Sequence, residues 1–190
     1  MIIYYWIMRK IDTNKQQAIQ QAVYDLVTAD GLTNLSMSKI ADSAHVSPAT
    51  IYIYYADKKD LLSQMYMAVK SSLDQGLMET INHGVDVTSK LKLALLHFAK
   101  FYEKHPKEIL FMWTMLHNST EVSEEANAFC RQRAAVVVEL ISTAIREELL
   151  ITSDILELQA LTFGSLSDYL QNGGTNIDVF VDHIVDRLID

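Results

Sequence analysis

The chain contains few of the residues that interrupt helices or form tight turns. Its 190 residues include two prolines, Pro48 and Pro106, and six glycines. An all-β protein of this length would need many more turn residues to connect its strands. Because 49% of the residues are hydrophobic, the chain can bury one sizeable core or two small ones. The sequence therefore predicts an all-α fold with short connections.

Cysteine is also scarce, since Cys130 is the single one in the chain. A disulfide framework and a paired-cysteine zinc site are therefore excluded, and a lone thiol is typical of the reducing cytoplasm. The six histidines show no metal-ligand spacing, and neither a glycine-rich phosphate loop nor a nucleophile elbow is present. We expect a cytoplasmic protein without metal, cofactor or enzymatic activity.

The sequence lacks a hydrophobic run long enough for a transmembrane helix. The apolar start, MIIYYWI, is short and is followed by Met8, Arg9 and Lys10, whereas a secretion signal carries its cations first. Two interpretations stay open: residues 1–11 are an N-terminal extension, or translation begins at Met8. A membrane anchor is a third, less favoured interpretation, and we expect no membrane partner.

No excess of positive charge marks the chain as a nucleic-acid binder, because its formal net charge is −8. Residues 1–62 carry six cations and six carboxylates, whereas residues 63–190 carry ten and eighteen. The neutral front third could still gather its cations on one face, and the acidic remainder should point away from DNA. Net charge alone neither supports nor excludes DNA binding.

Apolar residues recur at helical spacing along almost the whole chain. Glycine, proline and short polar stretches separate the periodic segments, and we find no convincing strand and no repeat. The pattern predicts about nine helices, at residues 13–29, 37–44, 48–54, 57–81, 89–104, 106–117, 121–150, 153–171 and 176–189.

The two short helices at 37–44 and 48–54 are typical of a helix-turn-helix. A turn of a few residues joins them, a longer helix precedes them, and Ser47 followed by Pro48 forms a helix start. In this motif the second short helix enters the major groove of DNA. We expect a DNA-binding domain at 12–58 and a second helical domain at 59–190.

The segment from Ala18 to Leu62 resembles the N-terminal signature of the TetR family of transcriptional regulators. The matching stretches are 36–41 (SMSKIA), 46–52 (VSPATIY), 54–55 (YY) and 58–62 (KKDLL). Two positions depart from the family pattern. His45 replaces the usual turn glycine, which implies a non-glycine residue at positive φ, and Tyr55 replaces a phenylalanine and should face inward with Ile51.

The resemblance implies a role in DNA binding for residues of the motif. Thr50 should contact a base edge or a nearby phosphate, Tyr54 should hydrogen-bond the phosphate backbone, and Lys58 should neutralise a phosphate. The full set of expected DNA contacts is Ser38, Lys39, Ser47, Pro48, Ala49, Thr50, Tyr52, Tyr54 and Lys58.

The last two predicted helices carry apolar stripes with small residues between them, and in this family such helices pair across a homodimer. An alternative is that these stripes only cover the chain's own core. The expected interface residues are Ile155, Leu158, Thr162, Ser165, Tyr169, Ile177, Phe180, Val181, Ile184 and Leu188.

Large aromatic and flexible side chains gather in the helices between residues 89 and 150. Such side chains could enclose an apolar or aromatic small-molecule effector, with a histidine or tyrosine orienting it. The expected effector-binding residues are Phe98, Tyr102, Met112, Trp113, Met115, His117 and Phe129.

Together these features predict an N-terminal three-helix DNA-binding domain followed by a helical ligand-binding and dimerisation domain. The resemblance implies a homodimeric repressor that a small-molecule effector releases from a pseudo-palindromic, double-stranded DNA operator. A helical interaction protein that binds no DNA is the alternative.

Overall fold

The computed structural model describes residues 12–189, and the predicted extension at residues 1–11 lies outside them. Within the described range the regular elements are helices, and one isolated antiparallel bridge joins Leu150 to Ile189. The all-α prediction is therefore confirmed. The chain divides into two compact units, the first ending at Leu61 and the second beginning at Leu62.

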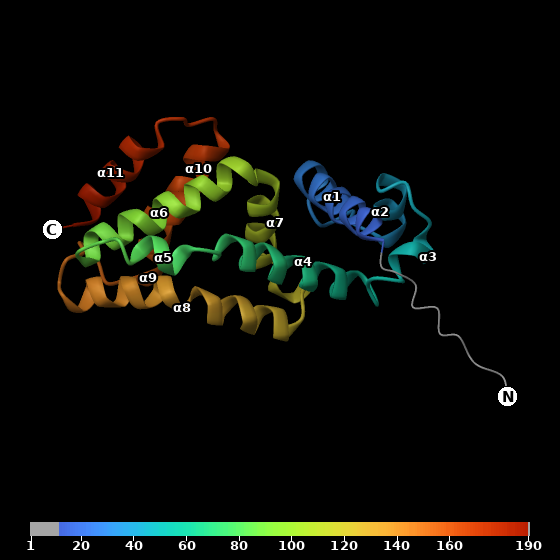
Figure 1. The fold of residues 1–190 in the computed structure, drawn as a ribbon, viewed down its shortest axis with the longest axis horizontal. Coiled ribbons are helices and arrows are strands. Elements are labelled where there is room, and N and C mark those ends of the chain that lie inside the picture. The colour runs from blue at the N-terminus through green and yellow to red at the C-terminus, as the bar shows by residue number, and fades with distance from the viewer. Residues whose placement is uncertain (1–11, 190) are drawn as a thin grey trace. The chain divides into compact units, whose positions relative to one another are not determined.

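In the described part of the first unit, residues 12–61, three helices precede α4 (Figure 1). They are α1 (Thr13–Asp30), α2 (Met37–Ser43) and α3 (Pro48–Ile51). Its core is apolar, because Ile19, Val23, Ile40 and Ile51 are fully or almost fully buried. Burying side chains of this size contributes about 1.5–3 kcal/mol each, which holds these short helices together.

The second unit is a helical bundle in which α6 is central. It contains α5 (Leu77–Ile81), α6 (Val87–Lys104), α7 (Pro106–His117), α8 (Glu124–Arg146), α9 (Ile155–Gln159), a π-helical segment (Ala160–Gly164), α10 (Ser165–Gln171), α11 (Ile177–Leu188) and a short 3₁₀ turn (Ser119–Glu121). Helix α6 packs against α5, α7, α8, α10 and α11 (Figure 1). Its buried residues include Leu91, Leu95 and Phe98, so one apolar helix face organises the unit.

Helix α4 (Lys58–Leu73) begins in the first unit and continues into the second. The predicted helix at 57–81 is wrong, because Gly76 takes a left-handed conformation with φ 77° and ends the α4 segment in a turn before α5. Glycine adopts this conformation at little cost, since it has no Cβ. The backbone N–H of Ser123 donates to the buried Ser63 hydroxyl at 2.8 Å and so attaches the start of α8 to α4.

Three other predicted helices differ from the structure. The helix expected at 48–54 ends at Ile51. The helix expected at 121–150 is α8, which is shorter (Glu124–Arg146), and Glu148 beyond its end has a positive φ of 54°. The helix expected at 153–171 is divided by the π-helical segment, where Thr162 donates its hydroxyl to the Leu158 carbonyl at 2.6 Å. A π segment adds a residue to a turn and changes which side chains face the core.

Candidate DNA-binding surface and effector pocket

Two serines fix the starts of the helix-turn-helix elements. The Ser36 hydroxyl accepts the backbone N–H of Lys39 at 3.3 Å, and the Ser47 hydroxyl accepts that of Thr50 at 3.2 Å. Such caps satisfy amide groups that have no partner within the helix. Between the helices His45 has φ 54°, so the predicted positive φ at this position is confirmed.

The predicted DNA contacts of α2 and α3 lie on the exterior of the first unit. Ser38, Lys39, Ser47, Pro48 and Ala49 are exposed, and Thr50 is half-buried. The Tyr52 side chain retains 56% of its accessible surface. Ile51 and Tyr55 are buried, as predicted, at 0% and 2% exposure. The motif therefore exposes small and hydroxyl-bearing side chains to solvent, and its apolar residues are buried beneath them.

Tyr54 is attached to the start of α1. Its hydroxyl donates to the backbone carbonyl of Asp12 at 3.2 Å, and its ring lies 6.3 Å from that of Tyr55. A DNA phosphate can only accept hydrogen bonds, and the Tyr54 hydroxyl has one proton to donate. The hydrogen bond to the Asp12 carbonyl must therefore break before Tyr54 can donate to a phosphate. In this structure Tyr54 links the motif to α1.

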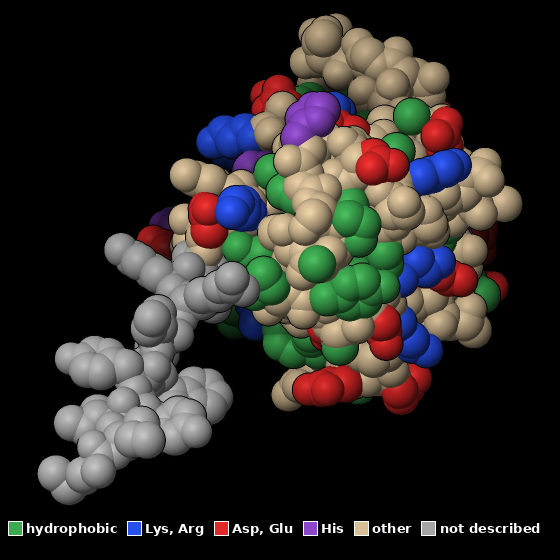
Figure 2. Space-filling view, turned by 90° about the vertical axis from the view of Figure 1, so that its right-hand side faces the viewer, with side chains coloured by type: hydrophobic (Ala, Val, Ile, Leu, Met, Phe, Trp, Pro, Cys, Tyr) green, Lys and Arg blue, Asp and Glu red, His purple; other side chains and the backbone are tan. Residues whose placement is uncertain are grey.

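Among residues 12–189, cations do not form a continuous field on the face that Figure 2 shows. The surface in Figure 2 is viewed from the side of Figure 1 on which α2 and α3 lie, and cations and carboxylates are interspersed around hydrophobic side chains. Lys58, the remaining predicted contact, is half-buried at the first turn of α4, where Asp60 receives the Ala56 backbone N–H at 2.8 Å. Phosphate recognition here would rely on a few placed groups.

Ile53 is an exposed residue that the sequence reasoning did not select. Its side chain keeps 53% of its accessible surface, beside the exposed Tyr52. Ala49 in α3 and Ile53 in the turn that follows α3 are both exposed. The signal was an isoleucine among outward-facing positions, where an apolar side chain can contact a thymine methyl group.

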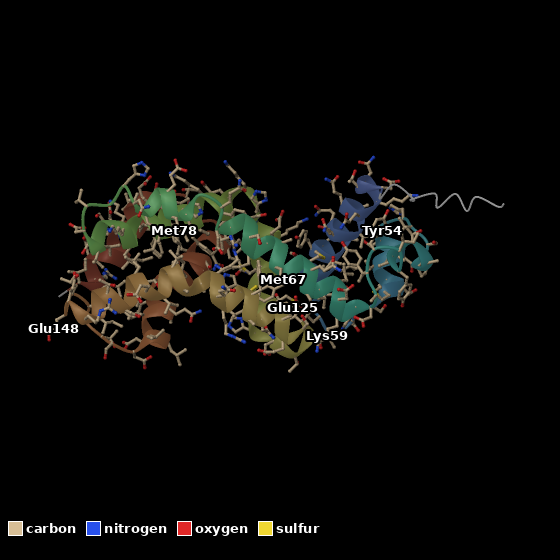
Figure 3. The ribbon with its side chains drawn as sticks, turned by 60° about the horizontal axis from the view of Figure 1, so that its bottom comes forward. Tyr54, Lys59, Met67, Met78, Glu125 and Glu148 are labelled. Carbon is tan, nitrogen blue, oxygen red and sulfur yellow. The ribbon has the colours of Figure 1, made fainter. Side chains whose placement is uncertain are left out.

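A pocket of about 500 Å³ lies inside the second unit. Its walls come from α4 to α9 and the π-helical segment, and α4 and α8 lie side by side here, with Met67 and Glu125 on neighbouring stretches (Figure 3). The lining is predominantly apolar. It includes Leu73, Leu77, Ala94, Phe98, Met112, Trp113, Val137, Ile141 and Phe163.

Three of the predicted effector contacts line this pocket, namely Phe98, Met112 and Trp113. The Phe98 ring meets Phe163 edge to face at 5.5 Å, and the Trp113 indole N–H donates to the Ser167 hydroxyl at 3.0 Å. These contacts fix the orientation of two aromatic walls.

The other four predicted effector residues lie outside the lining, each with a partner or position that explains it. Met115 is fully buried, and the exposed His117 ring is bonded through Nδ1 to the Trp113 carbonyl at 2.8 Å. Phe129 lies 5.5 Å beneath the Arg133 guanidinium. Burial raises the pKa of Tyr102, whose ring lies 6.5 Å from that of Phe98.

The pocket wall also carries polar residues that the sequence reasoning missed. The Lys70 ammonium lies 2.6 Å from the Asp74 carboxylate, which also accepts from Arg133 Nε at 3.0 Å. The signal in the sequence was a lysine and an aspartate four residues apart on one helix face.

Three further polar groups of the lining, His97, Cys130 and Tyr66, have partners within the fold. His97 Nε2 donates to the Leu73 carbonyl at 2.7 Å and so satisfies the end of α4. Burial raises the pKa of Cys130 to about 11 and also raises the pKa of Tyr66, its hydrogen-bond partner. Both groups are therefore neutral at physiological pH.

The predicted dimer residues fall into two groups. One group is buried inside the chain itself and comprises Leu158, Thr162, Val181, Ile184 and Leu188. These residues line the chain's own core and are not accessible to a second copy in this structure.

The second group is exposed or half-buried and comprises Ile155, Ser165, Tyr169, Ile177 and Phe180. Within it, Tyr169 and Phe180 stack on each other at 4.0 Å. Leu161 of the predicted apolar stripe is exposed as well, and two exposed apolar residues that the prediction did not include, Leu156 and Val179, lie nearby in the sequence.

Residues 12–189 contain no group of three or more histidine, cysteine or acidic side chains placed to hold a metal ion. In the same residues, no helix combines the length and hydropathy that crossing a bilayer requires.

The chain is similar in sequence to known transcriptional regulators. The family profile described as "Bacterial regulatory proteins, tetR family" matches residues 21–65. A fatty acid metabolism regulator protein of Bacillus subtilis is 23% identical over 158 residues, which are 81% of this chain and 80% of that protein. An uncharacterised HTH-type transcriptional regulator of Haemophilus influenzae is 36% identical over 81 residues, 43% of this chain and 41% of that protein.

Solved structures share the fold over almost the whole chain. A TetR family transcription regulator from Marinobacter aquaeolei has a TM-score of 0.78 and 24% identity, covering 96% of this chain and all of that one. A fatty acid degradation regulator from Bacillus halodurans has a TM-score of 0.67 and 19% identity, covering 92% and 94%. The helix-turn-helix, the all-α fold and these likenesses agree: the chain belongs to the TetR family of DNA-binding transcriptional regulators.

Proposed function

We propose that the protein is a homodimeric repressor that an apolar effector releases from a pseudo-palindromic operator. The observation that carries the DNA-binding part is the exposed face of α2 and α3 above the buried Ile51. Ser47, Pro48 and Ala49 keep the start of α3 slim, as entry into a major groove requires. The proposed place of action is the cytoplasm, and the proposed division of labour is DNA binding by residues 12–58 and effector binding and dimerisation by residues 59–190.

The DNA contacts can be tested with an operator selected from random or genomic fragments. Binding is followed by fluorescence anisotropy at several salt concentrations. We expect Lys58→Ala to weaken binding to all sequences and to reduce the salt slope by about one, because one phosphate contact is lost. Lys100→Ala is the matched control, since Lys100 is an exposed lysine of α6 in the second unit. An unchanged slope for Lys58→Ala contradicts the phosphate contact.

The half-buried Thr50 and the exposed Ile53 of the motif give a second test. Thr50→Ala and Ile53→Ser should each cost about 1–3 kcal/mol of operator affinity if they contact base edges, and should relax selectivity at individual base pairs. Both side chains lie outside the buried core, so circular dichroism should show unchanged helicity. Equal loss on specific and random DNA would assign them to the backbone instead.

The effector part of the proposal is supported by the pocket and by α4, which provides pocket residues and also begins in the first unit. A ligand that favours one conformation of α4 shifts operator affinity by its differential affinity for the two states. The two relatives named for fatty acid metabolism and degradation support an effector with an acyl-like apolar part. If saturating ligand leaves operator affinity unchanged, this part of the proposal fails.

The dimer part is supported by exposed apolar side chains on the last helices. Leu156 keeps 77% of its surface and Val179 keeps 55%. We expect Leu161→Arg to convert a dimer to a monomer in light scattering, because a charge would be desolvated at the interface. The Asp168→Arg exchange at an exposed polar position of α10 is the control.

A helical interaction protein without DNA binding is the competing function, and it would share the pocket and the apolar faces. It would give no enriched DNA fragment even at low salt. Repeating the selection on ligand-stripped protein separates this outcome from a repressor that was purified in its released state.

A further inference from the structure

Three charged side chains form a compact trio at the pocket, made of Lys70, Asp74 and Arg133. The Lys70 and Asp74 side chains retain 13% and 9% of their accessible surface, and Arg133 retains 38%. Lys70 and Asp74 line the pocket, whereas Arg133 does not belong to the lining. Asp74 is thus held between a lysine on the pocket side and an arginine outside it.

The trio carries one uncompensated positive charge. Two cations share a single carboxylate, at 2.6 Å and 3.0 Å. The other cation of the lining, Arg131, is paired with Glu124 at 2.5 Å on the exposed side of α8. The remaining titratable groups of the lining are His97, which donates to the Leu73 carbonyl, and the neutral Tyr66 and Cys130. In a chain with a net charge of −8, this pocket therefore has a local excess of positive charge.

The rest of the pocket accepts hydrocarbon. Phe98, Met112 and Phe163 form its interior wall, and Leu116, Val138 and Ile155 are exposed side chains of the same lining. Apolar walls with one charged anchor suit an amphipathic molecule, because the wall removes hydrocarbon from water and the anchor fixes its orientation.

We propose that the pocket binds an amphipathic monoanion, an apolar chain or ring system with one carboxylate, and that Lys70 receives the carboxylate. This inference rests on the proposed role of the pocket as the effector site. A lysine has three N–H donors, so Lys70 can bond a ligand carboxylate while it keeps or releases Asp74. Arg133 compensates Asp74 in either case, and no buried carboxylate is left without a partner.

The charge balance argues against three other kinds of headgroup, namely a cation, a neutral group and a dianion. A ligand cation would add a positive charge to a site that already carries one in excess, and a neutral headgroup would leave that excess as it is. A dianion would bring more negative charge than the trio can neutralise. A single carboxylate cancels the excess positive charge, so we expect the ligand to be a monoanion.

Trp113 reports directly on occupancy, because it lines the pocket. The test uses the full chain carrying Trp6→Phe, so that Trp113 is the single tryptophan. Decanoate, 1-decanol and decyltrimethylammonium are titrated below their aggregation concentrations, and calorimetry checks the stoichiometry. We expect decanoate to bind at least about tenfold more tightly than decanol, and the ammonium compound to bind most weakly.

Three variants separate charge recognition from folding. Lys70→Met should remove the preference for acid over alcohol while keeping decanol affinity, because Asp74 then pairs with Arg133 alone. Lys70→Arg should retain the preference, and Lys100→Met, at an exposed lysine of α6, is the matched control. Thermal unfolding identifies any variant that fails to fold. If Lys70→Met fails to fold, the acid preference of Lys70→Arg tests the role of the positive charge.

Equal binding of acid and alcohol by the unsubstituted pocket overturns the proposal, as does an acid preference that survives in Lys70→Met. Operator binding is measured separately with decanoate bound. Tight, Lys70-dependent binding of decanoate without any change in operator affinity supports the anion site and refutes the effector function.

Discussion

The Asp74→Asn substitution tests the charged trio by its effect on stability. Asparagine keeps the size of the side chain but removes the charge that two cations share, at 2.6 Å from Lys70 and 3.0 Å from Arg133. Breaking a fully buried ion pair costs about 3–5 kcal/mol, since the surviving charge stays buried without a partner. Arg133 is 38% exposed and is screened by water, so we expect a smaller loss of about 2–3 kcal/mol in the free energy of unfolding.

Urea unfolding followed by circular dichroism measures this loss, and a double-mutant cycle with Lys70→Met assigns it. Lys70→Met alone should cost about 1 kcal/mol or less, because Asp74 keeps Arg133 as its partner. The double variant should recover at least about 1 kcal/mol relative to Asp74→Asn, since the uncompensated lysine is gone. A loss below about 0.5 kcal/mol for Asp74→Asn, or no recovery in the double variant, refutes the reasoning.

Three other positions give independent predictions. Burial raises the pKa of Cys130 to about 11. Alkylation of this thiol at pH 8 should therefore be at least about a hundredfold slower in the native protein than in guanidinium, and it should accelerate as the pH rises. Equal rates in the native and unfolded protein would contradict the burial. His45→Val should destabilise the first unit by about 1–2 kcal/mol in urea unfolding, because a β-branched residue tolerates φ 54° poorly, whereas His45→Asn should be nearly neutral. Gly174→Ala would place a Cβ against the Tyr169 ring, and this ring cannot easily move because it stacks on Phe180 and accepts a hydrogen bond from the Asn176 backbone N–H. We therefore expect the substitution to lower the free energy of unfolding by about 1–3 kcal/mol in thermal unfolding, whereas the control Thr175→Ala should not.

The helix starts and the binding motif were predictable because their signals are local. Pro106 and the polar stretch after His117 predicted α7 at the bounds that the structure has. Ser47 caps α3 as its position before Pro48 indicated, and Ser36 caps α2 in the same way. The family resemblance added the expectation that His45 has a positive φ, and its value of 54° confirms this. Capping and turn conformation depend on neighbouring residues, so one sequence is enough to predict them.

What depended on tertiary packing was not predictable from apolar spacing. A stripe shows that a helix face is buried, but it does not show which surface covers it. Val181, Ile184 and Leu188 were expected at a dimer interface, yet they pack inside the chain. The end of α4 was missed, although Gly76 was present as a signal, because apolar spacing continued through it. The charged trio joins Lys70 of α4 and Asp74, which directly follows α4, to Arg133 of α8, and no local pattern connects the first two residues to Arg133.

The π-helical segment would couple ligand binding in one protomer of a homodimer to ligand binding in the other. Its five residues include Phe163, which lines the pocket, and Leu161, which is 40% exposed on the outside of the helix. A ligand that displaces Phe163 moves both side chains, because they belong to one turn with a non-standard hydrogen-bond register. In a homodimer formed through the exposed side of this helix, the first ligand therefore alters the surface against which the second protomer packs. Its binding curve would have a Hill coefficient different from one, without direct contact between the two ligands.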